Sequence, residues 1–70
     1  MTDDPLDPQR FIERAERHET EALHLDRAAE AALDGGHHET AAELIDLASE
    51  ERNRAIRYRR AAKVVREVRQ

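Results

Sequence analysis

The apolar residues of this chain recur at alternating intervals of three and four positions in two long stretches. The repeating positions are Phe11, Ala15, His18, Ala22, Leu25, Ala29 and Ala32, and then Ala41, Leu44, Ala48, Glu51, Ala55, Tyr58, Ala62 and Val65. This is the a/d spacing of a heptad repeat, in which one narrow stripe runs along each helix. The pattern predicts two amphipathic α-helices that pack together along these stripes.

The turn between the two helices is predicted at Asp34-Gly35-Gly36, which contains both glycines of the chain. Glycine commonly ends a helix because it adopts the left-handed backbone conformation without steric cost. We therefore expect a first helix over about residues 8–34, a turn at 35–37 and a second helix over about 38–69.

Capping signals indicate where each helix begins. Asp7-Pro8 combines a favoured N-cap residue with proline at the first helical position, and Asp4-Pro5 offers the same signal one turn earlier. Residues 1–6 are short and mostly polar, and we expect them to fray. In the second half, Thr40 to Glu43 fits a capping box, so the second helix is expected to begin either near His37 or at Thr40.

The a positions of both helices are all alanine, namely Ala15, Ala22, Ala29, Ala41, Ala48, Ala55 and Ala62. In an antiparallel hairpin closed by this turn, each a position faces a d position of the other helix. The two residue numbers of such a pair add up to 73, as for Ala15 and Tyr58. Each layer beyond the turn then sets one larger side chain against one alanine, which predicts a close approach of the helices. Charged neighbours of the seam are predicted to pair as Glu19 with Arg52 and Glu21 with Arg54.

The fold class that follows is all-α, an antiparallel two-helix hairpin with an alanine-rich coiled-coil seam, forming a single domain over residues 1–70. A core of this size rarely supplies more than roughly 3–5 kcal/mol. Further apolar residues lie beside the seam and would be covered in a homodimeric four-helix bundle or by a protein partner. The predicted interaction residues are Leu33, Leu44, Ile45, Leu47, Val64, Val65 and Val68.

The net charge of −4 conceals an asymmetry between the two ends. Residues 1–51 carry 15 acidic groups and 4 arginines, whereas residues 52–70 carry 8 basic groups and Glu67. One interpretation is charge complementarity between the two helices of the hairpin. The alternative is a nucleic-acid surface made by the basic residues Arg52, Arg54, Arg57, Arg59, Arg60, Lys63, Arg66 and Arg69.

Two polar side chains, His18 and Glu51, occupy the seam in adjoining layers and could form a hydrogen bond. Polar residues at such positions often fix register or oligomeric state. The alternative is a metal site of the four-helix di-iron kind, because Glu21 and His24 have Glu-x-x-His spacing and could join His18 and Glu51. His24 falls at an outward heptad position, however, which argues against a shared site.

No other residue pattern predicts chemistry. His37-His38 adjoins the turn and is expected to be an exposed pair, which could bind a metal ion adventitiously or titrate near neutral pH. No nucleophile is placed beside a base and there is no glycine-rich phosphate loop, so we expect neither an enzyme nor a cofactor. The chain has no cysteine and no apolar run of membrane-spanning length, and a cytoplasmic location without membrane contact is expected.

The stretch from Leu25 to Ala48 resembles the turn region of a tetratricopeptide repeat. The matching positions are Ala29, Gly36, Ala41, Ile45 and Ala48. Both helices are about twice as long as in that repeat and its usual aromatic residues are absent. The peptide-binding groove of the family is therefore not carried over to this chain.

In architecture, the whole chain also resembles the Rop-type hairpin, a family of small two-helix proteins with alanine-rich seams. That resemblance implies dimerisation into a four-helix bundle and binding of paired RNA loops. No RNA-contacting residue can be transferred by motif, and the first helix here is acidic. We therefore predict a non-catalytic interaction or oligomerisation module, a small accessory or regulatory subunit, with nucleic-acid binding and bundle metal binding as alternatives.

Overall fold

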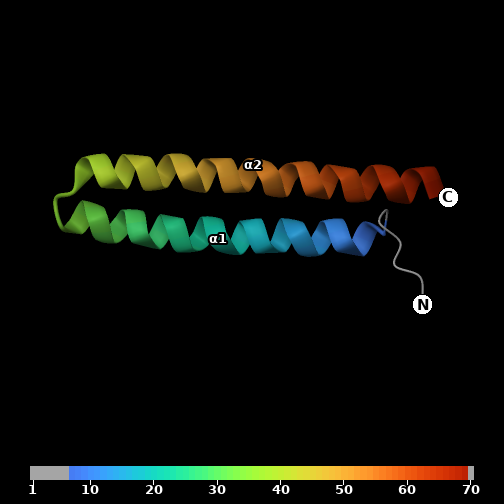
Figure 1. The fold of residues 1–70 in the computed structure, drawn as a ribbon, viewed down its shortest axis with the longest axis horizontal. Helices are drawn as coiled ribbons and strands as arrows, with labels where there is room; N and C mark the ends of the chain where they lie inside the picture. Colours follow the sequence, from blue (N-terminus) through green and yellow to red (C-terminus); the bar gives the residue numbers. More distant parts are fainter. Residues whose placement is uncertain (1–6, 70) are drawn as a thin grey trace.

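The computed structural model describes residues 7–69 and shows an antiparallel hairpin of two α-helices (Figure 1). α1 spans Pro8–Asp34 and α2 spans His38–Arg69. Within the described residues the two helices are the only regular elements, and they contact each other along their length. The all-α hairpin predicted from the heptad pattern is confirmed, and the bounds of both helices coincide with the expected ranges.

The start of α1 uses the first of the two capping signals. Asp7 has an extended backbone, and its carboxylate accepts a hydrogen bond from the backbone N–H of Gln9 at 3.0 Å. Pro8 follows at the first helical position, where its missing N–H costs no hydrogen bond. The alternative start at Asp4-Pro5 and the expected fraying of residues 1–6 lie outside the described residues.

α1 ends in a Schellman motif centred on the glycine pair. The N–H of Gly36 donates to the carbonyl of Leu33 at 3.0 Å, and the N–H of His37 donates to the carbonyl of Ala32 at 2.8 Å. Gly36 has a φ of 79°, in the left-handed region that favours glycine, whereas Gly35 has an ordinary φ of −85°. The left-handed glycine of the turn is thus Gly36.

α2 begins one turn earlier than the capping-box pattern suggests. The N–H of Ala41 already donates to the carbonyl of His37 at 3.0 Å, and His38 is the first helical residue. The alternative start at Thr40 is therefore wrong. The Schellman motif brings the chain directly into the new helix, so Thr40 lies within the first turn and does not cap it.

The core consists of alanine alone. The residues that are at most 3% exposed are Ala15, Ala22, Ala29, Ala41, Ala48, Ala55 and Ala62, which are the seven predicted a positions. The residues at the d positions are only half-buried. Among the described residues, no side chain larger than that of alanine is buried, so large apolar groups surround the core and do not fill it.

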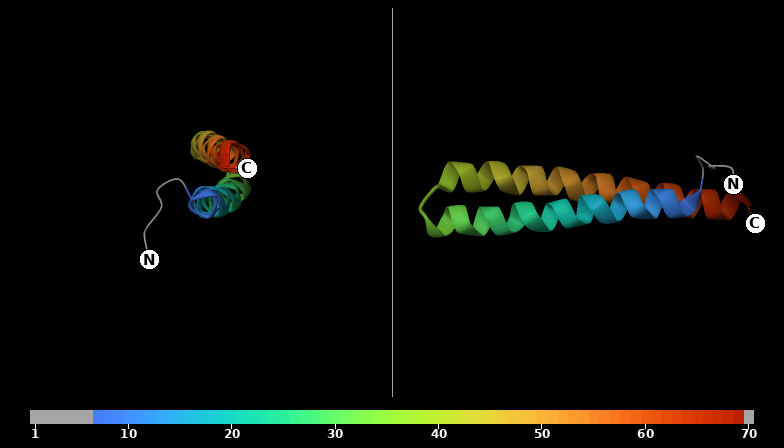
Figure 2. Two further views of the ribbon diagram at one scale, coloured as in Figure 1. Left: turned by 90° about the vertical axis from the view of Figure 1, so that its right-hand side faces the viewer. Right: turned by 60° about the horizontal axis from the view of Figure 1, so that its bottom comes forward.

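The hairpin is a single layer of helices. Its Cα atoms extend over 52 × 22 × 11 Å, and the radius of gyration is 15.9 Å, compared with about 11 Å for a compact domain of this length. Seen end-on, the two helices stand side by side without a third element over either broad side (Figure 2). A stable domain normally has two packed layers of secondary structure.

Candidate interaction surface

Large side chains at the d positions form a ladder along one side of the alanine core, which we call the d ladder. From the chain ends toward the turn its members are Val65, Phe11, Tyr58, His18, Glu51, Leu25 and Leu44. The ring of Tyr58 lies between those of Phe11 and His18, with centroid separations of 6.3 Å and 5.5 Å. This places Tyr58 at the level of Ala15, as the predicted layers require.

His18 and Glu51 meet across the helices at the centre of the d ladder. Nδ1 of His18 donates to Oε2 of Glu51, and Nη1 of Arg54 donates to Oε1 of the same carboxylate at 2.9 Å. The two seam side chains are 27% and 16% exposed. The hydrogen bond from His18, aided by the charges of His18 and Arg54, holds the pKa of Glu51 below its ordinary value of 4.5.

Arginine side chains border the aromatic end of the d ladder. The guanidinium of Arg14 lies over the ring of Tyr58, 5.8 Å from its centroid, at a distance typical of a cation–π contact. On the same side of the hairpin, a shallow hollow is lined by Phe11, Arg54, Arg57, Tyr58 and Ala61. This end of the ladder therefore combines exposed aromatic surface with positive charge.

The opposite side of the alanine core carries two ion pairs between the helices. Nε and Nη2 of Arg59 donate to the two carboxylate oxygens of Glu19 at 2.8 and 2.7 Å, and Nη2 of Arg52 donates to Oδ2 of Asp26. The hydrogen bond from Arg59 lowers the pKa of Glu19, and the carboxylate raises the pKa of Arg59 in return. Charge complementarity between the helices is thus present.

The partners in these ion pairs differ from the predicted ones. Glu19 bonds to Arg59 and not to Arg52, which lies one heptad away on α2. Helical side chains lean toward the N-terminus of their own helix, so an acid and a base on antiparallel helices converge when their backbone positions are offset along the axis, here by about five residues. Arg54, predicted to meet Glu21, bonds instead to Glu51 on the preceding turn of its own helix.

The residues of the metal hypothesis are only partly brought together. His18 and Glu51 are bonded, whereas Glu21 and His24 are exposed. Among residues 7–69, no group of three or more His, Cys, Asp or Glu side chains is placed to hold a metal ion. The His37-His38 pair is exposed beside the turn, as expected.

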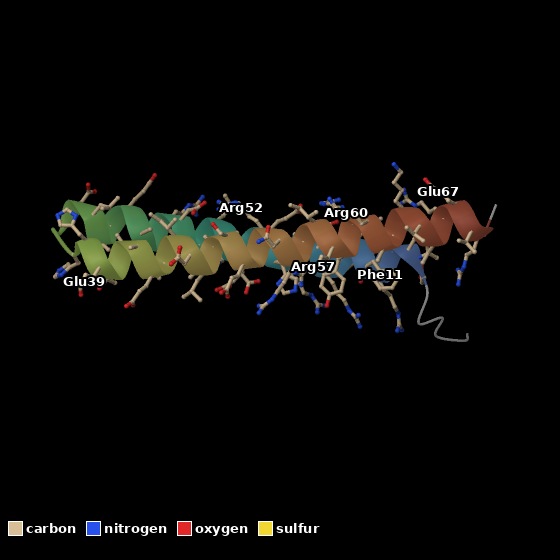
Figure 3. The ribbon with its side chains drawn as sticks, turned by 90° about the horizontal axis from the view of Figure 1, so that it is seen from above. Phe11, Glu39, Arg52, Arg57, Arg60 and Glu67 are labelled. Atoms are coloured by element: carbon tan, nitrogen blue, oxygen red, sulfur yellow. The ribbon has the colours of Figure 1, made fainter. Side chains whose placement is uncertain are left out.

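The basic residues of the nucleic-acid hypothesis do not share one face. Arg52, Arg54 and Arg59 are occupied by carboxylates of the same chain. Arg57 and Arg60 project on different sides of the hairpin (Figure 3). The remaining basic residues of this group, all exposed, are Lys63, Arg66 and Arg69.

Two broad sides of the hairpin follow from the helical repeat of 100° per residue. The d–g–c side contains the d, g and c positions of both helices, and the e–b side contains the e and b positions. Of the predicted interaction residues, the d–g–c side contains Leu44, Leu47, Val64, Val65 and Val68. Leu33 and Ile45, each 47% exposed, lie on the e–b side. The predicted set is therefore divided between two surfaces.

Sequence reasoning missed two exposed apolar residues of the e–b side. Leu23 is 55% exposed and Ile56 is 48% exposed, and together with Glu19, Arg52 and Ala55 they line a shallow hollow. Both occupy b positions, which lie outside a heptad stripe. A search for apolar residues at equivalent outward positions of the two helices would have found them.

Neither helix, within the described residues, is long and apolar enough to cross a membrane. Comparison of the chain with protein-family models, with curated proteins and with solved structures found no match. The function is therefore argued from the two sides of the hairpin and from the charges that they carry.

Proposed function

We propose that this chain is a non-catalytic protein–protein interaction module that associates with a second copy of itself to form a four-helix bundle. The composition of its core supports this proposal most directly, because the buried residues of the described chain are seven alanines. Each alanine contributes one methyl group, about 0.8 kcal/mol of burial free energy. A core of this kind holds two helices close together but leaves little stabilisation for an isolated hairpin.

The apolar side chains outside the core support the same proposal. Leu47, Val64 and Val68 are 47%, 55% and 79% exposed, and the larger members of the d ladder remain half-buried. Exposed apolar surface of this kind, present toward both ends of one side of a single layer, is typical of a protein–protein interface. A second hairpin packed on it would provide the missing layer.

Within this proposal the chain acts as a small accessory or regulatory subunit, and its activity is association. A cytoplasmic location stays a prediction from composition. The nucleic-acid alternative is less well supported, because three of its eight basic residues are paired within the chain and Arg57 and Arg60 point in different directions.

The proposal is tested by thermal unfolding at protein concentrations that differ by 100-fold. Because unfolding of a dimer also dissociates it, the melting temperature is expected to rise by several degrees with concentration. A helical chain whose melting temperature is independent of concentration would contradict self-association. If duplex RNA or DNA then raised that melting temperature, the nucleic-acid alternative would replace the proposal.

A further inference from the structure

Most charged and apolar residues of the d–g–c side follow one another in four zones, and the polar c positions Arg10, His24 and Glu43 lie at the outer edge of this side. The terminal apolar zone, near the chain ends, consists of Phe11, Ala61, Val64, Val65 and Val68. It is followed by a basic band of Arg14, Arg17, Arg54 and Arg57. Next comes an acidic band of Glu21, Glu50 and Glu51, and then a turn apolar zone of Leu25, Ala28, Leu44 and Leu47.

The two charged bands are largely available to a partner. Among residues 7–69, no ion pair is formed by Arg17, Arg57, Glu21 or Glu50, whereas Arg54 bonds to Glu51 at the boundary between the bands. Figure 3 shows Arg57 on the same side as Phe11, opposite Arg52. The available charges therefore lie on the side that also carries the d ladder.

The four zones are arranged symmetrically about the level of His18. Phe11 and Leu25 lie seven residues before and after His18, about 10 Å in each direction along the helix axis. On α2 the same level is marked by Ala55, and Val65 and Leu44 lie 10 and 11 residues from it. A rotation of 180° about an axis at this level, perpendicular to the helices, therefore exchanges one apolar zone with the other and the basic band with the acidic band.

We propose that the second copy packs on the d–g–c side in antiparallel orientation, about a two-fold axis at the level of His18. This proposal rests on the homodimer proposed above and adds its face and its orientation. In the complex, the terminal apolar zone of one copy covers the turn apolar zone of the other, and each basic band lies against an acidic band. The apolar contacts supply burial, and the charges supply specificity.

This orientation sets α1 opposite α1 of the second copy and α2 opposite α2. Arg17 then lies near Glu21 of the second copy, and Arg57 lies near Glu50 of the second copy. Because the interface is two-fold symmetric, each of these pairs occurs twice. The hollow lined by Phe11 and Tyr58 would then receive side chains of the second copy that lie near its Leu47.

Other arrangements bring like charges together or use charges that are already paired. A parallel dimer on the same side sets α1 opposite α2, so that Arg17 faces Arg57 and Glu21 faces Glu50. On the e–b side, four of the five charged residues at e positions, all but Arg66, are occupied by the Glu19–Arg59 and Asp26–Arg52 pairs of the same chain. The antiparallel d–g–c dimer has neither disadvantage.

The first test uses two charge-reversed variants of the full chain. Arg17→Glu with Arg57→Glu cancels the net charge of the basic band, and Glu21→Arg with Glu50→Arg reverses the net charge of the acidic band. Each variant alone is expected to dissociate at about tenfold or more higher concentration than the original chain, measured by sedimentation at low salt. An equimolar mixture is expected to form a heterodimer about as tight as the original dimer.

Controls with the same change of charge are available at outward f positions. Arg27→Glu with Arg60→Glu and Glu13→Arg with Asp46→Arg are expected to leave the dissociation constant within about twofold, because f positions lie outside the d–g–c side. If these controls weaken the dimer as much as the band variants, or if the mixture does not recover affinity, the proposed face is wrong.

The second test determines orientation, using the fact that the chain contains no cysteine. A mixture of Leu47→Cys and Ala61→Cys chains is expected to form the mixed disulfide on oxidation, whereas Leu47→Cys alone is not, since its two copies lie about 24 Å apart along the axis. Efficient cross-linking of Leu23→Cys with Ile56→Cys instead would place the interface on the e–b side.

The two proposals fail in different ways. A dimer whose affinity is unchanged by the charge reversals, or that cross-links through Leu23→Cys and Ile56→Cys, would contradict the proposed face and orientation. Such a result would still support self-association. A chain that remains monomeric at every concentration overturns both. Sedimentation of the original chain, measured alongside the variants, separates these two cases.

Discussion

The imidazole of His18 lies almost parallel to the ring of Tyr58, with centroids 5.5 Å apart and planes inclined by 5°. The same imidazole donates a hydrogen bond to Glu51. One residue of α1 thus contacts both the ring of Tyr58 and the carboxylate of Glu51, two members of the d ladder from α2. Polar pairs on an otherwise apolar seam generally favour one register at some cost in stability.

Replacing the polar pair by leucine is expected to raise stability and reduce specificity. The double variant His18→Leu, Glu51→Leu removes two half-buried polar groups together, and its free energy of unfolding should rise by about 1 kcal/mol, as found when ion pairs are exchanged for apolar residues. Glu51→Leu alone leaves the imidazole without its acceptor and should be less stable than the double variant. Thermal unfolding followed by circular dichroism measures both, and a double variant less stable than either single variant would contradict this account.

Enlarging a core alanine is expected to force the helices apart. Ala22 and Ala48 are 1% and 0% exposed, so Ala22→Leu or Ala48→Leu should lower the free energy of unfolding by about 1–3 kcal/mol. Ala42→Leu is the matched control, because Ala42 is exposed on the same helix as Ala48. Denaturant unfolding measures the difference, and a core variant more stable than the control would show that the helices do not pack at this distance.

The turn is expected to tolerate substitution at one glycine and not at the other. Gly36 has a φ of 79°, so Gly36→Ala should cost about 1–2 kcal/mol in the free energy of unfolding. Gly35 has an ordinary φ, and a Cβ there would come close to the movable ring of His37, at 3.0 Å, and into ordinary contact with the carbonyl oxygen of Ala31, at 3.6 Å. Gly35→Ala should therefore be the milder change in chemical denaturation, and equal effects would contradict the Schellman geometry.

Acid is expected to destabilise the hairpin through Glu51 and Glu19. Hydrogen bonds from His18 and Arg59 lower the pKa of these carboxyls below the ordinary value of 4.5 in the folded chain. At the same pH, the unfolded chain therefore binds more protons at these two groups than the folded chain does. Their stabilisation is present above pH 4.5 and is lost as the pH falls through the lower folded values. Melting temperatures measured across this range should fall less steeply for Glu51→Gln, and a profile that coincides with that of the original chain would exclude this contribution.

The core and the turn could be predicted from sequence because local rules determine them. Alanine at every seventh position allows only one close-packed stripe per helix, and Gly36 supplies the left-handed residue that ends α1. The position of Tyr58 between Phe11 and His18 then follows from the layer pairing.

The ion pairs and the start of α2 could not be predicted from spacing alone. Glu19 reaches Arg59 because helical side chains lean along the helix axis, a displacement that a pairing of Cα levels ignores. Thr40 satisfies a capping pattern, but α2 begins two residues earlier, at His38. The two broad sides became distinct only when the helices were placed together, which is why Leu23 and Ile56 were missed.

Native mass spectrometry of the purified chain, sprayed without chelator, shows whether the hairpin associates with a second copy. We predict a dimer of twice the 8.1 kDa chain mass with no added mass from metal ions or nucleic acid. A monomer that persists at concentrations where the chain is fully helical would contradict it, because the d ladder would then be stable without a second layer.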